Sequence, residues 1–494
     1  MQYKTLKLKV IIGILNYLVL LQAKSEGPFL ATGIKIGEVT QNEAIVWVRL
    51  TEKPNPTDRD ATEPIIRYKD PESGKLLTRD ELPWSRADRI PVVKYPEGYN
   101  TNNIPGATPG SKGQVRLKYR SKNKKNWNVI GWQRVDSQKD YTYQFKLSDL
   151  TAGKNYQLTV EASPMNNNKV TASIDGEFTT APSRNSPEEI NFIVTTGTSY
   201  GDTDSKTGYK LYQNSLKLDP EFFVHTGDIV YYDGYAKNIE LARWHWERQY
   251  SYPNNINFHK QVASYFIKDD HDTWVNDCYP DRVTRFMGDF TFEQGLKVFL
   301  EQVPMGNKTY RTIRWGKDLQ IWLVEGRDYR SPNPMPDGPR KSIWGKEQLE
   351  WFISTVHSSD ATYKVLISPT PIVGPDRKGK NDNHANSGFE YEGDLIREFM
   401  AQQKNMVSVC GDRHWQYVSK DKETGLLEFS CGPGSHEHAG GWDQNDKRPE
   451  HIYLNVVGGF MEGSISRVNG QAILIFRHYD PDGKLLNEYT LQPE

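Results

Sequence analysis

The chain has 494 residues, and its 62 lysines and arginines nearly balance its 63 aspartates and glutamates. The resulting net charge of -1 gives no strong field for nucleic acid or for an anionic membrane, so neither is expected as a stable partner. The length is sufficient for a large core and about two domains. Only 36% of the residues are hydrophobic but 12% are aromatic, which predicts a loop-rich globular protein with aromatic packing.

The first residues have the composition of an export signal. Three lysines, at positions 4, 7 and 9, precede a short apolar run at residues 10–21, and Leu-Gln-Ala at 21–23 is a possible cleavage site. The apolar run is too short to cross a bilayer comfortably. We therefore expect residues 1–23 to be a cleaved signal peptide, which predicts a secreted or periplasmic protein with no membrane anchor after cleavage.

Residues 27–185 are predicted to form a β-sandwich domain. Apolar and polar residues alternate in short runs at 32–40, 43–50 and 114–119. A polar interval rich in proline and glycine separates the second run from the third, at about 53–112. Residues 143–160 and the closing segment at 176–182 resemble the later strands of a fibronectin type III sandwich. Such a module could bind sugar or protein, or it could only cover one side of a second domain.

A second domain is predicted over residues 188–494, where apolar strands alternate with helical stretches. This alternation indicates a layered α/β fold. The expected strands lie at 190–195, 222–224, 319–324, 363–368 and 406–410, and the clearest helices at 239–250 and 345–356. The tail, from about 426 to 492, returns to β strands.

Side chains of the types that bind metals follow several of these strands. Asp228 stands in a Gly-Asp turn, and residues 268–277 hold four aspartates, one histidine and one asparagine. Gly-Asp-Arg-His at 411–414 follows a third strand, and Asn-Asp-Asn-His at 381–384 lies in a polar loop. Because open α/β sheets bind ligands outside the carboxyl ends of their strands, these residues are expected to meet there. Oxygen and nitrogen donors suit hard or borderline cations, although each segment alone could also be a turn or a solvated acidic surface.

Four motifs together resemble the alkaline phosphatase D family, a branch of the calcineurin-like metallophosphoesterases. They are Gly-Asp-Ile-Val-Tyr at 227–231, Asp-Asp-His-Asp with a following Asn-Asp at 269–277, Trp-Gly-Lys-Glu-Gln-Leu-Glu-Trp at 344–351, and Gly-Asp-Arg-His at 411–414. The resemblance runs from about residue 191 to 441. It implies a four-layer α/β/β/α domain with two metal ions at the sheet edge, and secreted phosphomonoesterase or phosphodiesterase activity.

The resemblance also implies roles for individual residues. Asp228 would bridge the two ions, and Tyr231 and His414 would bind the first ion, which is iron in the family. Asn276 and Asp412 would bind the second ion, which is calcium in the family.

Three further residues would stand near the substrate. Asp270 and His271 match the family's Asp-His pair, with His271 as a possible acid for the leaving group. Arg327 matches a family arginine that could contact an oxyanion, and a structural salt bridge is the alternative.

One position departs from the family pattern. The family places a cysteine, an iron ligand, after the first strand of this domain, and Gly197 stands at that position here. Thr196 or Thr198 could lend a hydroxyl, or the site could hold a different cation, a single ion or none. Two alternatives to phosphoric ester hydrolysis follow. They are hydrolysis of a sulfate ester on a polysaccharide by the altered site, and a non-catalytic binding protein with a decayed site.

The cysteines and two further histidines carry weaker patterns. Three cysteines spread through the second half favour buried free thiols over a disulfide framework. Cys278-Tyr-Pro-Asp-Arg matches the Cys-x-Pro-x-Arg core of sulfatases, but it directly trails the Asp-Asp-His-Asp motif, and we interpret it as coincidence. His436 and His438 lie beside glycines and could line the cleft or pack over it.

The sequence thus leads to one main hypothesis. The protein is expected to be an exported, metal-dependent hydrolase of phosphoric esters, acting on a small-molecule or polymer substrate. Metal ions, by family resemblance calcium and iron, would activate a water molecule that attacks phosphorus in line.

Overall fold

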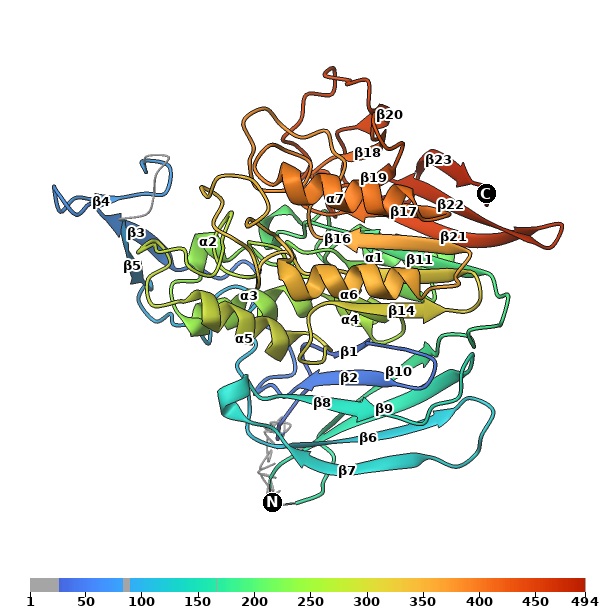
Figure 1. The fold of residues 1–494 in the computed structure, drawn as a ribbon. Helices are drawn as coiled ribbons and strands as arrows, with labels where there is room; N and C mark the ends of the chain where they lie inside the picture. The colour runs from blue at the N-terminus through green and yellow to red at the C-terminus, as the bar shows by residue number, and fades with distance from the viewer. Residues whose placement is uncertain (1–25, 83–88, 166, 494) are drawn as a thin grey trace, which may run out of the picture.

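Two large sheets pack face to face at the centre of the computed structural model, which describes residues 26–82, 89–165 and 167–493 (Figure 1). The predicted signal peptide at 1–23 lies outside the described residues. The nine-stranded sheet has the order β23 (Leu485–Leu491), β22 (Gln471–Tyr479), β21 (Phe460–Val468), β11 (Ile190–Thr195), β12 (Phe222–His225), β13 (Ala263–Phe266), β1 (Ile34–Gly37), β2 (Ala44–Arg49) and β8 (Thr142–Leu147). The seven-stranded sheet has the order β14 (Arg311–Trp315), β15 (Leu319–Leu323), β16 (Tyr363–Ser368), β17 (Met406–Cys410), β19 (Leu427–Cys431), β18 (Gln416–Lys420) and β20 (His451–Asn455).

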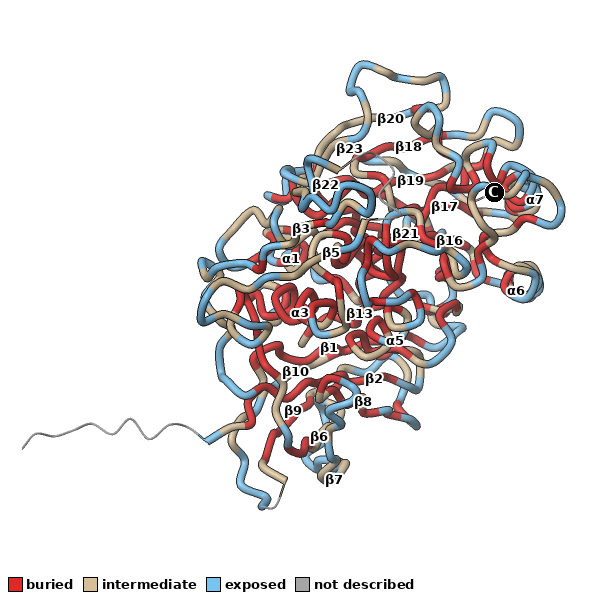
Figure 2. The backbone as a smooth tube through the Cα atoms, turned by 90° about the vertical axis from the view of Figure 1, so that its left-hand side faces the viewer, coloured by how far each residue is buried: buried red, intermediate tan, exposed pale blue. Residues whose placement is uncertain are grey.

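The central strands are buried on both faces, which explains their continuous apolar sequences. In β12, Phe222 and Val224 belong to the core between the two sheets, whereas Phe223 belongs to the cluster under the helices. The ring of Phe222 stacks on Trp315 of the opposite sheet, with centroids 4.8 Å apart. Figure 2 shows this buried interior surrounded by exposed loops.

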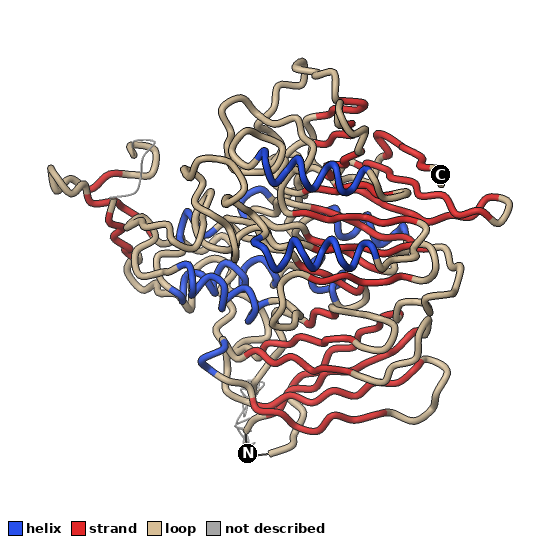
Figure 3. The backbone as a smooth tube through the Cα atoms, viewed as in Figure 1, coloured by secondary structure: helices blue, strands red, loops and turns tan. Residues whose placement is uncertain are grey.

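Helices form the two outer layers (Figure 3). On the nine-stranded sheet, apolar clusters join β11, β12 and β13 to α1 (Lys210–Ser215), α3 (Ile239–Tyr250), α4 (Pro253–His259) and α5 (Phe292–Gln302). On the seven-stranded sheet, another cluster joins β15 and β16 to α6 (Gly345–His357) and α7 (Glu390–Ala401). The predicted four-layer α/β/β/α arrangement is confirmed. The helix predicted at 239–250 has the observed bounds, and the one predicted at 345–356 extends one residue further.

The predicted N-terminal sandwich is also present. A four-stranded sheet, in the order β10 (Ala172–Thr179), β9 (Asn155–Ser163), β6 (Gln114–Ser121) and β7 (Asn128–Arg134), packs on β1, β2 and β8. Its partner strands also belong to the nine-stranded sheet, because β1 pairs in parallel with β13, with Gly37 opposite Ser264. One sheet is therefore shared across the boundary expected near residues 185–188.

The polar interval at 53–112 contains a small sheet that projects from the molecule, on the left of Figure 1. Its strands are β4 (Leu76–Leu77), β3 (Ile65–Lys69) and β5 (Ile90–Lys94). Tyr68 anchors it by stacking on Phe286, with ring centroids 4.9 Å apart.

Two expectations about composition can be compared with the structure. All three cysteines are buried and free, as predicted. Within the described residues, no helix is both long enough and apolar enough to cross a membrane.

Candidate metal centre

A tight turn places Asp228 at the carboxyl end of β12. Gly227 has a φ of 110°, and a Cβ there would lie 2.7 Å from the backbone nitrogen of Asp269, so the close approach to the next strand end requires glycine. Asp228 itself has a φ of 56°, a backbone conformation that is uncommon outside glycine and is often found at functional sites. The turn buries the Asp228 side chain, which is 3% exposed.

A phenol and an imidazole meet at this carboxylate. Tyr231, at the start of α2 (Tyr232–Tyr235), donates its hydroxyl to Asp228 Oδ2 at 3.1 Å. Its oxygen also lies 3.3 Å from Nε2 of His414, which in turn lies 3.6 Å from Asp228 Oδ2. Asp228 Oδ1 is buried and has no hydrogen-bond donor among the described residues. The structure thus brings together three of the residues expected to bind metal.

The Asp-His pair after β13 completes the acidic group. Asp228, Asp270 and His271 each offer a potential ligand atom, and these atoms lie within 4.8 Å of one another. His271 is held from behind by a hydrogen bond between its Nδ1 and Asp233 Oδ2. Burial opposes a charge on His271, but Asp270, Asp233 and Asp228 overcome it and raise its pKa well above the ordinary value. Asp270 is fixed in turn by the backbone N–H of Asp277, at 2.6 Å.

The two residues expected to bind the second ion differ in burial. Asp412 lies between β17 and β18 and has a φ of 59°. Its Oδ2 is 2.7 Å from Nη1 of Arg413, but these two atoms do not have the geometry of a hydrogen bond. Burial raises the pKa of Asp412 although Arg413 opposes the shift, and nearby Asp270 adds to it. Asn276 is exposed, and its backbone N–H donates to Asp233 Oδ1 at 3.0 Å.

Arg327 is buried behind the acidic group. It is 1% exposed, and its guanidinium donates to Asp269 Oδ1 at 2.7 Å and lies 3.7 Å from Asp270 Oδ2. These contacts match the structural salt bridge, the alternative that the sequence left open. Cys278 is buried beside it, with Sγ 3.6 Å from the carbonyl oxygen of Asp270, and burial raises the pKa of this thiol. A buried thiol in this environment fits our interpretation of the Cys-x-Pro-x-Arg match as coincidence.

Three residues at the centre have no role that their sequence pattern indicated. His438 was noted only as a side chain that could line the cleft, yet its Nε2 lies 2.6 Å from the hydroxyl of Tyr231. Its Nδ1 lies 2.7 Å from Asp202 Oδ2, a partner 236 positions away that no local signal could have indicated. Asp233 could have been found, because it stands only two residues after Tyr231, just beyond the motif at 227–231.

The polar loop at 381–384 contacts neighbouring side chains instead of joining this group of ligands. His384 Nε2 lies 2.8 Å from Glu392 Oε2, and the His384 side chain is fully buried. Asp382 pairs with Lys380 at 2.9 Å. The segment is therefore a structural part of the loop.

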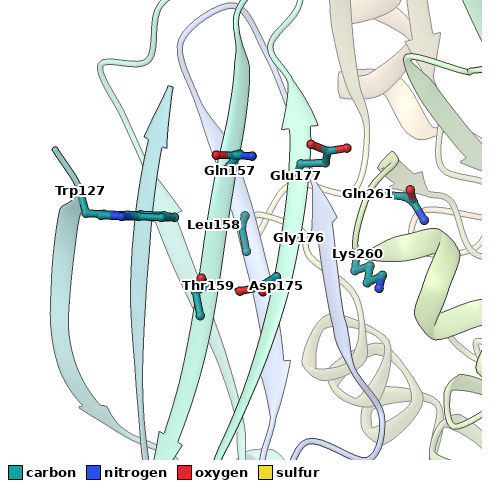
Figure 4. A pocket seen from close by; sticks show the side chains of 9 residues that line it. All are labelled: Trp127, Gln157, Leu158, Thr159, Asp175, Gly176, Glu177, Lys260 and Gln261. Atoms are coloured by element: carbon teal, nitrogen blue, oxygen red, sulfur yellow. Dashed lines mark hydrogen bonds between the residues drawn. The ribbon is translucent and has the colours of Figure 1, made fainter. Parts of the chain in front are cut away.

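A groove of about 440 Å³ lies elsewhere, between the four-stranded sheet of the sandwich and the loop after α4 (Figure 4). Figure 4 shows Lys260 and Gln261 on one side and residues of β9 and β10 on the other. The two parts are in direct contact, because the backbone N–H of Glu177 donates to the carbonyl oxygen of Lys260 at 2.9 Å. This groove is therefore the margin of a packing interface.

The residues at the strand ends fit a bound cation. Carboxylates, a phenol and imidazoles converge there, and Asp228 Oδ1 and Asp412 Oδ2 are buried without a donor among the described residues. Packing acids together in this way without a cation would disfavour their charged forms. Oxygen and nitrogen donors of this kind suit divalent or trivalent ions.

Comparison with known proteins gives a consistent result. The profile of the PhoD-like phosphatase family matches residues 192–456, more than half of the chain. The structure of PhoD superposes with a TM-score of 0.69 at 15% identity, covering 95% of this chain and 91% of that one. A purple acid phosphatase isolated from yellow lupin (Lupinus luteus) seeds superposes with a TM-score of 0.61 at 12% identity, covering 93% and 74%. No curated protein sequence matches the chain.

Proposed function

Because the chain belongs to the PhoD-like phosphatase family, we propose that it is an exported, metal-dependent hydrolase of phosphoric esters. The observation that carries the proposal is the environment of Asp228. This buried carboxylate has one oxygen without a donor among the described residues, and it is surrounded by Tyr231, His414 and the Asp270–His271 pair. A carboxylate in this position can contact two cations at once.

The proposed ligand sets are those that the family resemblance implies. Asp228 would bridge the two ions, with Tyr231 and His414 on the first ion and Asp412 and Asn276 on the second. Calcium and iron are the ions that the family resemblance suggests. Two cations held here would orient the ester and activate a water molecule for attack in line at phosphorus.

His271 is proposed to supply the proton for the leaving oxygen. Asp233 accepts a hydrogen bond from Nδ1, which fixes the ring and leaves Nε2 as the nitrogen that can reach a substrate. The same carboxylate also receives the backbone N–H of Asn276, so it links the acid to the proposed second ion. Arg327 is proposed to act as a positioning residue, because it holds Asp269 and Asp270 without reaching the surface.

The test is ester hydrolysis by the purified mature protein, with bound metal counted in the same sample. The substrates are p-nitrophenyl phosphate, bis-p-nitrophenyl phosphate and p-nitrophenyl sulfate. Asp228→Asn should lower kcat/KM for the phosphate esters by roughly a thousandfold or more, since it removes the proposed bridging charge. Asp219→Asn is the matched control, because Asp219 is exposed and also has a positive φ, of 50°.

The outcomes separate the hypotheses. Phosphate release that depends on Asp228 and on one or two ions per chain supports the proposal and ranks monoesters against diesters. Release of sulfate alone would replace it with the sulfate-ester alternative. A protein with neither turnover nor metal would favour the non-catalytic alternative.

A further inference from the structure

His438 lies at the centre of the site without an assigned role. It follows β19 in the chain, and its side chain is 12% exposed. Its ring packs against that of His414, with centroids 4.2 Å apart, and its Nε2 lies 2.6 Å from Tyr231 Oη. His438 Nε2 is thus closer to the Tyr231 oxygen than either Asp228 Oδ2 or His414 Nε2 is.

The hydrogen bonds of His438 define which ring nitrogen faces the site. Nδ1 lies 2.7 Å from Asp202 Oδ2, and an ionised carboxylate can only accept, so Nδ1 carries the proton. In the neutral ring, Nε2 then presents a lone pair toward Tyr231. In protein metal sites, a histidine that binds the metal through one ring nitrogen usually donates the N–H of the other nitrogen to a carboxylate.

The hydroxyl of Tyr231 has two acceptors beside it, Asp228 Oδ2 at 3.1 Å and His438 Nε2 at 2.6 Å, and a third polar atom, His414 Nε2, at 3.3 Å. A phenol has a single proton to donate. A cation among the four side chains would satisfy all of these donor atoms together.

The backbone keeps His438 in this position. Gly434 donates its N–H to the carbonyl oxygen of Gly197 at 2.9 Å, which ties the loop after β19 to the loop after β11. A Cβ at Gly197 would lie 3.0 Å from Cδ2 of His438 and 3.4 Å from Nε2 of His414. The imidazole of His438 therefore occupies the space that a side chain at position 197 would need.

We propose that His438 binds, through Nε2, the same metal ion as Tyr231 and His414. Asp202 is the positioning residue that orients the ring. The inference rests on the proposed function, since both need a cation at Asp228. Two imidazoles with a phenolate and a carboxylate suit a first-row transition ion better than Ca²⁺, which prefers oxygen ligands alone.

The experiment measures metal binding, independently of turnover. Metal-free full-length mature protein is titrated with Zn²⁺ by calorimetry and with Co²⁺ by visible absorption. His438→Ala and His438→Gln should each lower the affinity for one bound ion by roughly 100-fold or more and change the Co²⁺ spectrum. Asp202→Asn should lower the affinity for the same ion by about 10–100-fold, the usual effect of removing a residue that hydrogen-bonds to a metal ligand. His436→Ala is the matched control, because His436 is exposed in the same loop.

The results distinguish this inference from the function on which it rests. If both His438 variants bind Co²⁺ with the affinity and spectrum of the wild type, while Asp228→Asn does not bind it, His438 is not a ligand and the proposed function stands. If the wild type itself binds neither ion, both proposals fail. His438→Gln retains a side chain of similar length, so loss in both variants with unchanged circular dichroism supports ligation rather than unfolding.

Discussion

Two neighbouring pairs of residues after β13 differ in what surrounds their buried charges. Lys268 contacts Glu325 and Asp328 at 2.5 and 2.6 Å, and Asp269 contacts Arg327 at 2.7 Å, so each charge in the first pair has an opposite charge beside it. The second pair, Asp270 and His271, also has opposite charges nearby, since His271 contacts Asp233 and Asp270 lies 3.7 Å from Arg327, but it faces further acids as well. There the nearest groups include Asp228, whose Oδ1 has no donor among the described residues; Asp269 Oδ2 also lacks a donor, but Asp269 has Arg327 beside it.

The difference between the two pairs shows which buried charges the folded chain can accommodate without a ligand. A buried ion pair can form part of a stable core when its hydrogen bonds are complete, whereas carboxylates packed on one another oppose folding until a cation or protons arrive. The first pair therefore acts as a support, and the second pair belongs to a binding site. Three measurements would test this contrast.

The largest effect is expected from breaking the ion pair between Arg327 and Asp269. Arg327→Met should lower the free energy of unfolding by about 3–5 kcal/mol, because it leaves the buried Asp269 and Asp270 without the guanidinium beside them. Urea unfolding checks this. Arg184→Met is the control, since Arg184 pairs with Asp360 at an exposed site and should cost at most about 1 kcal/mol. Equal losses in the two variants would refute the supporting role of Arg327.

A substitution in the binding site should change the free energy of unfolding in the opposite direction. In chelator, Asp228→Asn should be at least as stable as the wild type, because it removes a buried carboxylate that lacks a full set of partners. A metal ion at about 100 times its Kd should stabilise the wild type by roughly 2.7 kcal/mol and leave the variant unchanged. Asp219→Asn should respond to metal like the wild type. A destabilised Asp228→Asn protein in chelator would show that Asp228 has a structural role.

The smallest effect concerns Glu221, which precedes β12 at the end opposite to Asp228. Burial raises its pKa from 4.5 to about 7, although the backbone N–H of Asn191 donates to it. The folded state therefore binds this proton more tightly than the unfolded state. The associated stability is complete below pH 4.5 and is lost as the pH rises through about 7.

Glu221→Gln should remove this dependence. Between pH 4 and pH 8 the wild type should lose about 1–2 of the roughly 3 kcal/mol that a pKa shift from 4.5 to about 7 represents, because Glu221 is partly exposed; the variant should keep this stability. Unfolding free energies of both proteins at the two pH values test the prediction. Parallel pH profiles would mean that Glu221 does not titrate between those limits.

Local pattern was sufficient for much of the fold. The apolar strands and the helix Ile239–Tyr250 were found from periodicity, because each was long enough to bury a recognisable face. The four motifs indicated the family and the place of Asp228, Tyr231 and His414 at the strand ends. Those predictions needed only the order of the elements and the direction of the strands.

The contacts that decide the chemistry were not predictable in the same way. Arg327 could have reached a substrate or a carboxylate, and only its burial against Asp269 distinguishes the two. The sequence also placed a domain boundary near residue 185, and it had no means of showing that β1 pairs with β13. Strand pairing between distant segments depends on hydrogen-bond register, which leaves no mark in either segment alone.

The sequence by itself determined the layered fold, the family and the types of side chain that gather at the sheet edge. Tertiary structure alone decided their partners, because Tyr231 meets His438 across 207 positions and His438 meets Asp202 across 236. Periodicity describes which face of an element is buried, whereas the position of a ligand atom is fixed by loops from several strands that close on one point.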